Sequence, residues 1–184
     1  MKSIDIRTPL GDGDVRALRS GDAVSIRGTI YTARDAAHRR LIEALDAGRE
    51  LPLPLAGQII YYAGPAPSRP GQIVGPVGPT TSYRMDAYTL PLLARGLKGM
   101  IGKGHRSEDV VTGMVEHGAV YFGAIGGAAA LIARCVRSCE IVAYEDLGAE
   151  AIHALTVEAF PAIVIIDAQG NDLYRTERAK YARP

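Results

Sequence analysis

The chain has 184 residues, enough for one globular domain with a core of its own. Hydrophobic residues make up 47% of it and charged residues 22%, which excludes a disordered or fibrous chain. Its 21 Lys and Arg against 20 Asp and Glu give a formal net charge of +1, too balanced for the broad basic face that binds nucleic acid. We therefore expect a single domain over residues 1–184, with any cationic site confined to a small part of its surface.

The N-terminus and the apolar stretches carry no targeting pattern. Asp5 interrupts the first apolar run, so the continuous apolar core of a signal peptide is missing. The longest apolar stretch, residues 119–133, is rich in Gly and Ala and shorter than the roughly 18 residues of a membrane span. The sequence therefore predicts a cytoplasmic protein without membrane contact.

Two cysteines, Cys135 and Cys139, are separated by three residues, a spacing that would place both on one face of a helix. One interpretation is a redox pair or part of a metal site, although no further cysteine completes a four-ligand set. The simpler interpretation, which we favour, is two small buried thiols in a reducing compartment.

In the first third of the chain, alternating polar and apolar residues predict strands over residues 2–8 and 23–31, with a short amphipathic segment between them. A helix follows, because Asp35 suits a first helical turn and Gly48 suits the position just past a helix end. Arg34 therefore lies at a junction between a strand and a helix.

Most of the prolines lie in residues 51–79, which excludes long helices there, although residues 58–63 read as a buried strand. Helical periodicity begins at Ser82 and stops at Gly96. The elements expected next are strand 99–101, helix 107–116, strand 119–122, helix 127–134 and strand 141–144. Such alternation favours an α/β fold with a partly parallel sheet, whose ligand-binding loops follow the strand ends.

The C-terminal part reads as strands with a hairpin. Apolar runs at 152–157 and 162–166 predict strands, and the turn residues 169–172 lead into Leu173 and Tyr174, which we expect to begin the second arm of a hairpin.

Residues 78–86, Gly-Pro-Thr-Thr-Ser-Tyr-Arg-Met-Asp, concentrate hydroxyl groups and an arginine where a loop becomes a helix. Free N–H groups and the positive end of the helix dipole attract an anion at such a position. The alternative is that Thr80, Thr81 or Ser82 only caps the helix and that Arg84 is solvated.

A second loop of this kind is Gly102-Lys103-Gly104. The flanking glycines let the backbone approach a ligand closely, and the lysine adds a point charge. Its spacing is not that of a Walker loop. His105, the next residue, is either a general acid or base or an exposed loop histidine.

Together, Arg34, Arg84 and Lys103 would supply the charge needed to hold two carboxylates, and the arginines could bind them as bidentate forks. The residues therefore predict a small dicarboxylate as the ligand.

These same runs carry a family resemblance. Residues 32–38 (Thr-Ala-Arg-Asp-Ala-Ala-His), 78–86 and 102–104 resemble the β region of the class I fumarase and L-tartrate dehydratase family. The likeness extends in order and spacing from about Ile4 to Tyr174. It implies one swivelling β/β/α domain over residues 1–184, an α/β fold with a mixed, partly parallel sheet flanked by helices.

The resemblance implies the β subunit of a two-chain hydro-lyase of α2β2 composition that reversibly removes water from a small hydroxy-dicarboxylate. The partner α subunit would carry a [4Fe-4S] cluster on cysteines of its own, which acts as a Lewis acid on the leaving hydroxyl. Malate and fumarate, intermediates of the tricarboxylic acid cycle, are the first expectation for the substrate. The chain alone would be inactive.

Residue roles follow from the same resemblance. Thr80 matches the family's proposed catalytic base. The matched substrate-binding positions are Arg34, Thr81, Arg84 and Lys103. Neither Cys135 nor Cys139 matches a cluster ligand, so we expect no metal site in this chain. His105 departs from the family pattern, where asparagine is more common, and leaves the choice of substrate open.

Two alternatives remain. The chain could belong to an L-tartrate dehydratase or to a relative acting on a methylated dicarboxylate, since no residue here reads the extra hydroxyl of tartrate. It could instead be a non-catalytic swivelling module that closes over a partner's site. In that case Arg84→Ala would change assembly and not turnover.

Overall fold

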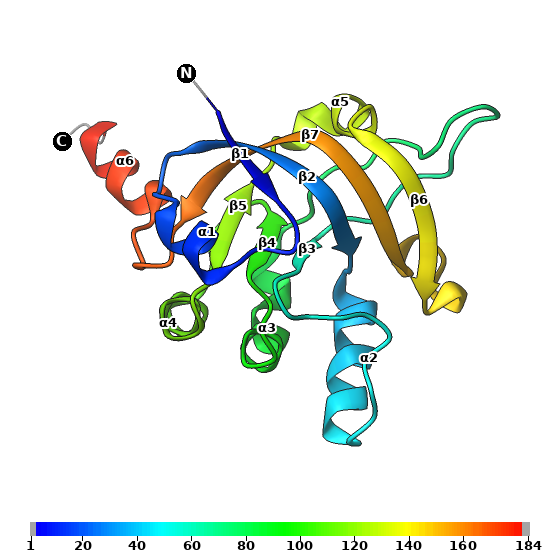
Figure 1. Cartoon of the computed structure of the whole chain (residues 1–184), viewed down its shortest axis with the longest axis horizontal. Coiled ribbons are helices and arrows are strands. Elements are labelled where there is room, and N and C mark those ends of the chain that lie inside the picture. The colour runs from blue at the N-terminus through cyan, green and yellow to red at the C-terminus, as the bar shows by residue number, and fades with distance from the viewer. Residues whose placement is uncertain (1–2, 182–184) are drawn as a thin grey trace.

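The computed structural model describes residues 3–181, and its largest feature is one seven-stranded sheet that closes on itself (Figure 1). The strands are β1 (Ile4–Arg7), β2 (Ala23–Thr32), β3 (Ile59–Tyr61), β4 (Gly99–Gly102), β5 (Val120–Gly123), β6 (Val136–Ala143) and β7 (Ile152–Ile166). The sheet order is β1-β2-β3-β4-β5-β7-β6, and β7 also pairs with β2. Strands β2, β3, β4, β5 and β7 thus form a small closed barrel, with β1 and β6 added at its sides.

Pairing is parallel from β1 through β5 and antiparallel wherever β7 takes part. The long strand β7 closes the barrel because its residues 154–163 pair with β2 and its residues 163–166 pair with β5, while residues 152–157 also pair with β6. The expected α/β fold with a mixed, partly parallel sheet is therefore confirmed.

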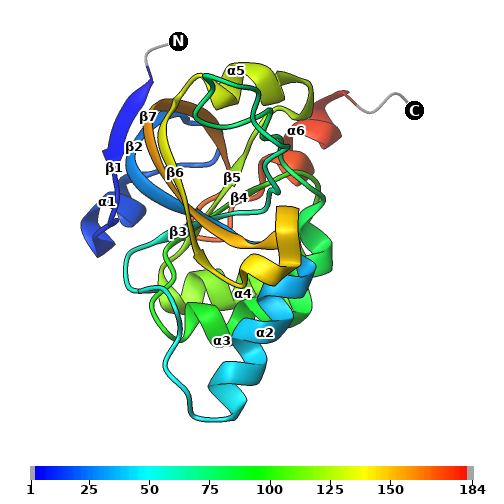
Figure 2. The same cartoon turned by 90° about the vertical axis from the view of Figure 1, so that its right-hand side faces the viewer.

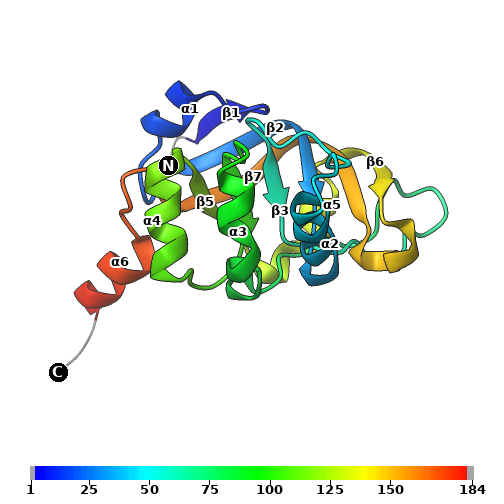
Figure 3. The same cartoon turned by 90° about the horizontal axis from the view of Figure 1, so that it is seen from below.

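The helices are α1 (Asp12–Ala17), α2 (Asp35–Asp46), α3 (Asp86–Leu93), α4 (Glu108–His117), α5 (Ala129–Ala133) and α6 (Leu173–Tyr181), with 3-10 turns η1 (Ser82–Met85), η2 (Gly126–Ala128) and η3 (Glu145–Glu150). Helices α2, α3 and α4 are the crossovers between the parallel strands, and they lie side by side against one face of the barrel (Figures 2 and 3). Parallel strands need such crossovers, and each one brings the start of its helix near the end of a strand.

Two hydrophobic cores result from the alternation of side chains along the strands. On β3, Ile59 and Tyr61 belong to the core inside the barrel, whereas Ile60 and the following Tyr62 belong to the core under the crossover helices. Both faces of this strand are therefore buried, as its continuous apolar run predicts.

The local expectations for the two cysteines and for residues 173–174 were wrong. Cys139 lies in β6, and Cys135 directly precedes that strand, so they are not on one helical face. Residues 173–174 begin helix α6 and not a hairpin arm. The reason is Asp172, whose carboxylate accepts a hydrogen bond from the Tyr174 amide at 2.9 Å and so caps the helix.

No helix within residues 3–181 is long and apolar enough to cross a membrane.

Candidate active site

Arg34 lies where β2 passes into α2, as the sequence predicts (Figure 1). It is the residue before the first turn of α2, and its guanidinium nitrogen Nη2 lies 3.3 Å from the Glu150 carboxylate. Its Nε is buried and has no hydrogen-bond partner. Gly64 packs against the side chain, since a Cβ built on Gly64 would lie 3.3 Å from Arg34 Cδ and 2.5 Å from the Ala149 carbonyl oxygen. The absence of a side chain at Gly64 leaves room for Arg34.

Arg84 lies beside the start of the same helix. It belongs to η1, and its Nη2 is 3.3 Å from the carboxylate of Asp35, the first residue of α2. Since Asp35 directly follows Arg34, the two arginines of the predicted site converge on the N-terminus of α2. Both side chains remain partly exposed, 27% for Arg34 and 37% for Arg84, so an anion from solvent can reach them.

Thr80 and Lys103 are joined through the backbone. The Lys103 amide donates to the Thr80 carbonyl at 3.3 Å, the Ser82 amide donates to the Lys103 carbonyl at 2.9 Å, and Thr81 forms a bridge with Lys103. Thr80 is held from behind as well, because both its amide and its hydroxyl donate to the Tyr62 carbonyl oxygen, each at 2.7 Å. The two predicted loops therefore run side by side at the ends of β3 and β4.

The ammonium group of Lys103 is exposed and, among residues 3–181, makes no ion pair or hydrogen bond. Thr81, next to it, lines a hollow of about 590 Å³ together with Tyr83, Gly104 and His105. His105 lies on the rim, where its ring packs edge-on against Tyr174 at 5.1 Å. The structure thus brings Thr80, Thr81, Lys103 and Arg84 onto adjoining loops, with Arg34 at the neighbouring helix start.

His38 lies behind these loops, and no local sequence pattern predicts that it supports the site. His38 is fully buried and donates from Nδ1 to the Arg34 carbonyl at 2.9 Å, while its Nε2 has no partner. Burial lowers the pKa of His38 to about 4, so the ring is neutral near pH 7. A neutral ring that donates from Nδ1 holds the backbone of Arg34 in place.

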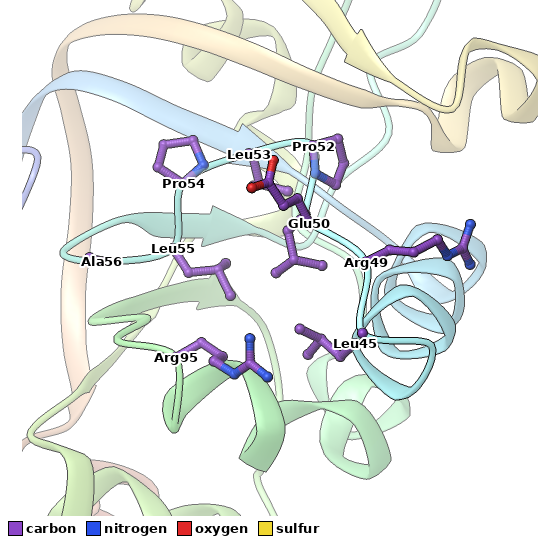
Figure 4. Close-up of a pocket in the computed structure, with 11 residues that line it drawn as sticks. Leu45, Arg49, Glu50, Pro52, Leu53, Pro54, Leu55, Ala56 and Arg95 are labelled. Carbon is purple, nitrogen blue, oxygen red and sulfur yellow. The ribbon is translucent and has the colours of Figure 1, made fainter.

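A hollow of about 720 Å³ lies at the other end of the crossover helices (Figure 4). It opens between the end of α2 and the end of α3 and is lined mostly by Leu and Pro side chains, with Arg95 at one wall. None of the five predicted site residues lines it. Helix carbonyl ends, which disfavour anions, surround it, so size alone does not make it the active site.

Cys135 and Cys139 are free thiols, half-buried, and burial raises the pKa of each. Within residues 3–181 no three His, Cys, Asp or Glu side chains converge to hold a metal ion. An iron–sulfur cluster takes thiolate ligands, and the two cysteines of this chain do not fit a [4Fe-4S] cluster.

The fold and the geometry define a class of protein: a small mixed barrel, closed by an antiparallel strand, with a cationic loop cluster at the ends of its parallel strands. The sequence pattern of the fumarase C-terminus family matches residues 1–177, and the chain belongs to this family. The predicted family is thereby confirmed.

Relatives of two kinds support this membership. The anaerobic class I fumarate hydratase of Escherichia coli is 45% identical over 154 residues, which cover 83% of this chain and 28% of that enzyme. Fumarate hydratase 2 of Leishmania major is 40% identical over 84% of this chain and 28% of its own length. A Methanocaldococcus jannaschii protein provisionally named L(+)-tartrate dehydratase subunit beta is 38% identical over 91% of this chain and 89% of its own. This chain thus spans little more than a quarter of the fumarate hydratases and nearly all of the subunit.

Proposed function

We propose that this chain is the β subunit of a hydro-lyase and forms one wall of a site for a small hydroxy-dicarboxylate, with malate and fumarate as the substrate pair. The observation that carries the proposal is that Arg34 and Arg84 meet at the start of α2, while the segment from Thr80 to Arg84 runs beside the loop of Lys103, whose side chain is exposed. Three cations on adjoining loops match the charge and spread of a ligand with two carboxylates.

Binding is the first task of these residues. Each arginine gives one nitrogen to an acidic neighbour, Arg34 to Glu150 and Arg84 to Asp35, and retains further N–H donors for a ligand. Lys103 adds a point charge from the facing loop. The substrate carboxylates would be held between the α2 start and the Lys103 loop, with the carbon chain next to Thr80.

Proton removal is the second task, which we assign to Thr80. Its hydroxyl hydrogen points to the Tyr62 carbonyl, so lone pairs of Oγ1 are free to face the substrate. A neutral threonine hydroxyl is a weak base, so Thr80 would act as its alkoxide, which the cations on the adjoining loops favour. In dehydration, the alkoxide would accept the proton from the carbon next to one carboxylate and become the hydroxyl that donates to Tyr62. The electron pair of that C–H bond forms the double bond, and the hydroxyl leaves the neighbouring carbon and takes up a proton from the α subunit to become water.

The remainder of the site would come from a partner. We propose an α subunit that carries the [4Fe-4S] cluster, in an α2β2 assembly, because this chain supplies no cluster ligand set and because the M. jannaschii relative of nearly equal length is named as a subunit. The fumarate hydratases, more than three times as long as the aligned segment, would hold both parts in one chain.

The substrate is tested by assembling the chain anaerobically with its α subunit and offering L-malate and L(+)-tartrate in separate assays. Faster turnover of malate is expected. Faster turnover of tartrate would favour the second candidate function, an L-tartrate dehydratase, which the sequence identity to the tartrate dehydratase subunit supports. If neither is turned over by an assembled, cluster-loaded enzyme, the hydro-lyase proposal fails and the non-catalytic swivelling module takes its place.

A further inference from the structure

Arg106 is buried behind the site. The side chain of Arg106 has no exposed surface, although Lys103, three residues earlier, is exposed. Burying a cation without partners costs several kcal/mol of desolvation free energy. The surroundings of Arg106 must therefore be specific to it.

The guanidinium group of Arg106 is held on all sides. Its Nε donates to the Asp86 carboxylate at 2.7 Å and its Nη2 donates to the Thr89 hydroxyl at 2.8 Å. Its plane lies over two aromatic rings, at 5.3 Å from the centre of Tyr62 and 5.2 Å from the centre of Tyr121. Burial opposes the charged form, but Tyr62, Asp86 and Tyr121 outweigh it and raise the pKa of Arg106. The group is thus a permanent buried cation.

Tyr62 and Tyr121, whose rings enclose this cation, also hold the two loops of the site, Tyr62 through its backbone and Tyr121 through its hydroxyl group. The backbone carbonyl of Tyr62 accepts both hydrogen bonds from Thr80. The hydroxyl of Tyr121 donates to the Gly104 carbonyl at 2.9 Å and lies 2.9 Å from the Ser82 hydroxyl. The Thr80 segment is therefore held by the Tyr62 backbone, and the Tyr121 hydroxyl contacts both loops.

Asp86 adds a third tie. Its second carboxylate oxygen accepts the Ser107 amide at 2.7 Å, at the start of α4, while Asp86 itself begins α3. Through this one ion pair the loop that carries Lys103 is fastened to the segment that carries Arg84.

We propose that Arg106 is a positioning residue, which fixes the spacing between Thr80 and Lys103 by holding Tyr62, Tyr121 and Asp86 in one stack. It touches no substrate. The kinetic part of this inference rests on the proposed function, and its structural part does not.

The kinetic test uses Arg106→Ala and Arg106→Lys in the enzyme assembled with its α subunit, with L-malate as substrate. Both variants should lose about 10²-fold in kcat/KM, on the scale that small misplacements of catalytic groups produce. Lysine keeps the positive charge but has neither the planar guanidinium fork nor its stacking on the rings, so Arg106→Lys should not restore kcat/KM. Guanidinium ion at millimolar concentration should restore part of the activity of Arg106→Ala, and tetramethylammonium should not. Arg137→Ala, which breaks an exposed ion pair with Glu158, is the matched control and should leave kcat/KM unchanged.

The structural test is hydrogen exchange on the same variants. The amides of Thr80 and Ser82 should exchange faster, while the amides between β2 and β7 should not change. Unchanged exchange at the Thr80 and Ser82 amides would overturn the proposal, and so would uniformly faster exchange across the chain in both variants, because Arg106 would then only stabilise the fold. If the wild-type assembly does not turn over malate, the proposed function fails while the exchange result still decides the role of Arg106.

Discussion

The carboxylate of Asp35 lies 3.3 Å from the guanidinium of Arg84, and Asp35 is the chain neighbour of Arg34. One acidic residue at the start of α2 therefore links the two arginines of the site. An acidic side chain at this position also suits the positive end of the helix dipole, so it stabilises α2 as it holds Arg84.

Arg84→Ala should weaken substrate binding without preventing assembly. Loss of a charge-assisted contact to a carboxylate corresponds to about 1.5–3 kcal/mol, or roughly 10-fold to 100-fold in kcat/KM. Arg84→Lys should recover only part of this loss, because a point charge replaces a bidentate fork. Steady-state kinetics on the assembled enzyme measures the effect, and Arg27→Ala, which removes an exposed ion pair on β2, is the control. Lost assembly with normal turnover per assembled enzyme would support the non-catalytic module instead.

Thr80 and Lys103 should give different kinetic signatures. Thr80→Val removes the proposed base and should lower kcat by about 10²-fold to 10⁴-fold with little change in KM. Thr80→Ser keeps the hydroxyl and should retain much more of the rate. Lys103→Met should mainly raise KM. Equal effects of both substitutions on KM would show that Thr80 only binds substrate.

The sequence predicted the position of every one of these residues but not what supports them. Arg34 and Lys103 each directly follow the end of a strand or lie one residue beyond it. The alternation of apolar and polar residues over a few positions is enough to predict where such strands end. Arg106 and His38 are polar residues whose burial depends on contacts between α2, α3, β3 and β5, which are far apart in the chain. No local pattern can disclose them.

The barrel was predictable only in part. The parallel pairing of β2 to β5 follows from alternating strands and helices, but the closure by β7 does not. That strand runs unbroken through Pro161, so the prediction of two separate strands over 152–157 and 162–166 was wrong. Pro161 lacks an amide hydrogen but stays in register opposite Ser25, and Ala159 takes the left-handed conformation just before it. The strand therefore continues through both Pro161 and the left-handed backbone of Ala159.

His38 should make stability fall with acid. Its pKa is about 4 in the folded chain, because of burial first and of the nearby Arg106 cation among the lesser causes, against 6.5 in the unfolded chain. The unfolded state therefore binds more protons between these values. The stability is fully present above pH 6.5 and is lost as the pH falls toward 4, by about 3 kcal/mol in total.

Urea unfolding at several pH values measures this loss, and His38→Gln should remove most of the slope between pH 6.5 and 4. Burial also lowers the pKa of His153, which remains in the variant and accounts for a residual slope of the same sign. An identical slope in His38→Gln and the wild type would contradict the assignment.

Gly102 should not tolerate a side chain. A Cβ at this position would lie 1.9 Å from the Ser82 hydroxyl oxygen and 2.9 Å from a ring carbon of Tyr62. Gly102→Ala should therefore destabilise the chain by about 1–3 kcal/mol and displace the Lys103 loop. Gly127→Ala, where a Cβ meets nothing within 4 Å, is the control and should be close to neutral in thermal unfolding. Equal melting temperatures for the two variants would contradict the tight packing behind the loop.

The surface around the site should bind the α subunit. Tyr83 and Ile125 are 64% and 70% exposed, and both lie beside the site, since Tyr83 precedes Arg84 and the Ala124 amide donates to the Gly102 carbonyl. Large exposed apolar side chains next to charged loops are typical of a surface that a partner covers.

Ile125→Asp should weaken binding of the α subunit by about 2 kcal/mol or more, which is roughly 30-fold, since a charge would be buried at the contact. Sedimentation of mixed α and β chains measures the affinity. Val115→Asp is the matched control, because Val115 is exposed on α4 and lines a hollow with Lys98 and His117 at the end of the crossover helices away from the site. It should leave the affinity unchanged. Arg84→Ala should also bind the α subunit normally, so that lost assembly and lost turnover separate in the two variants. If Val115→Asp, and not Ile125→Asp, abolished binding, the partner would cover the other end of the molecule, and the shared site would have to be rejected.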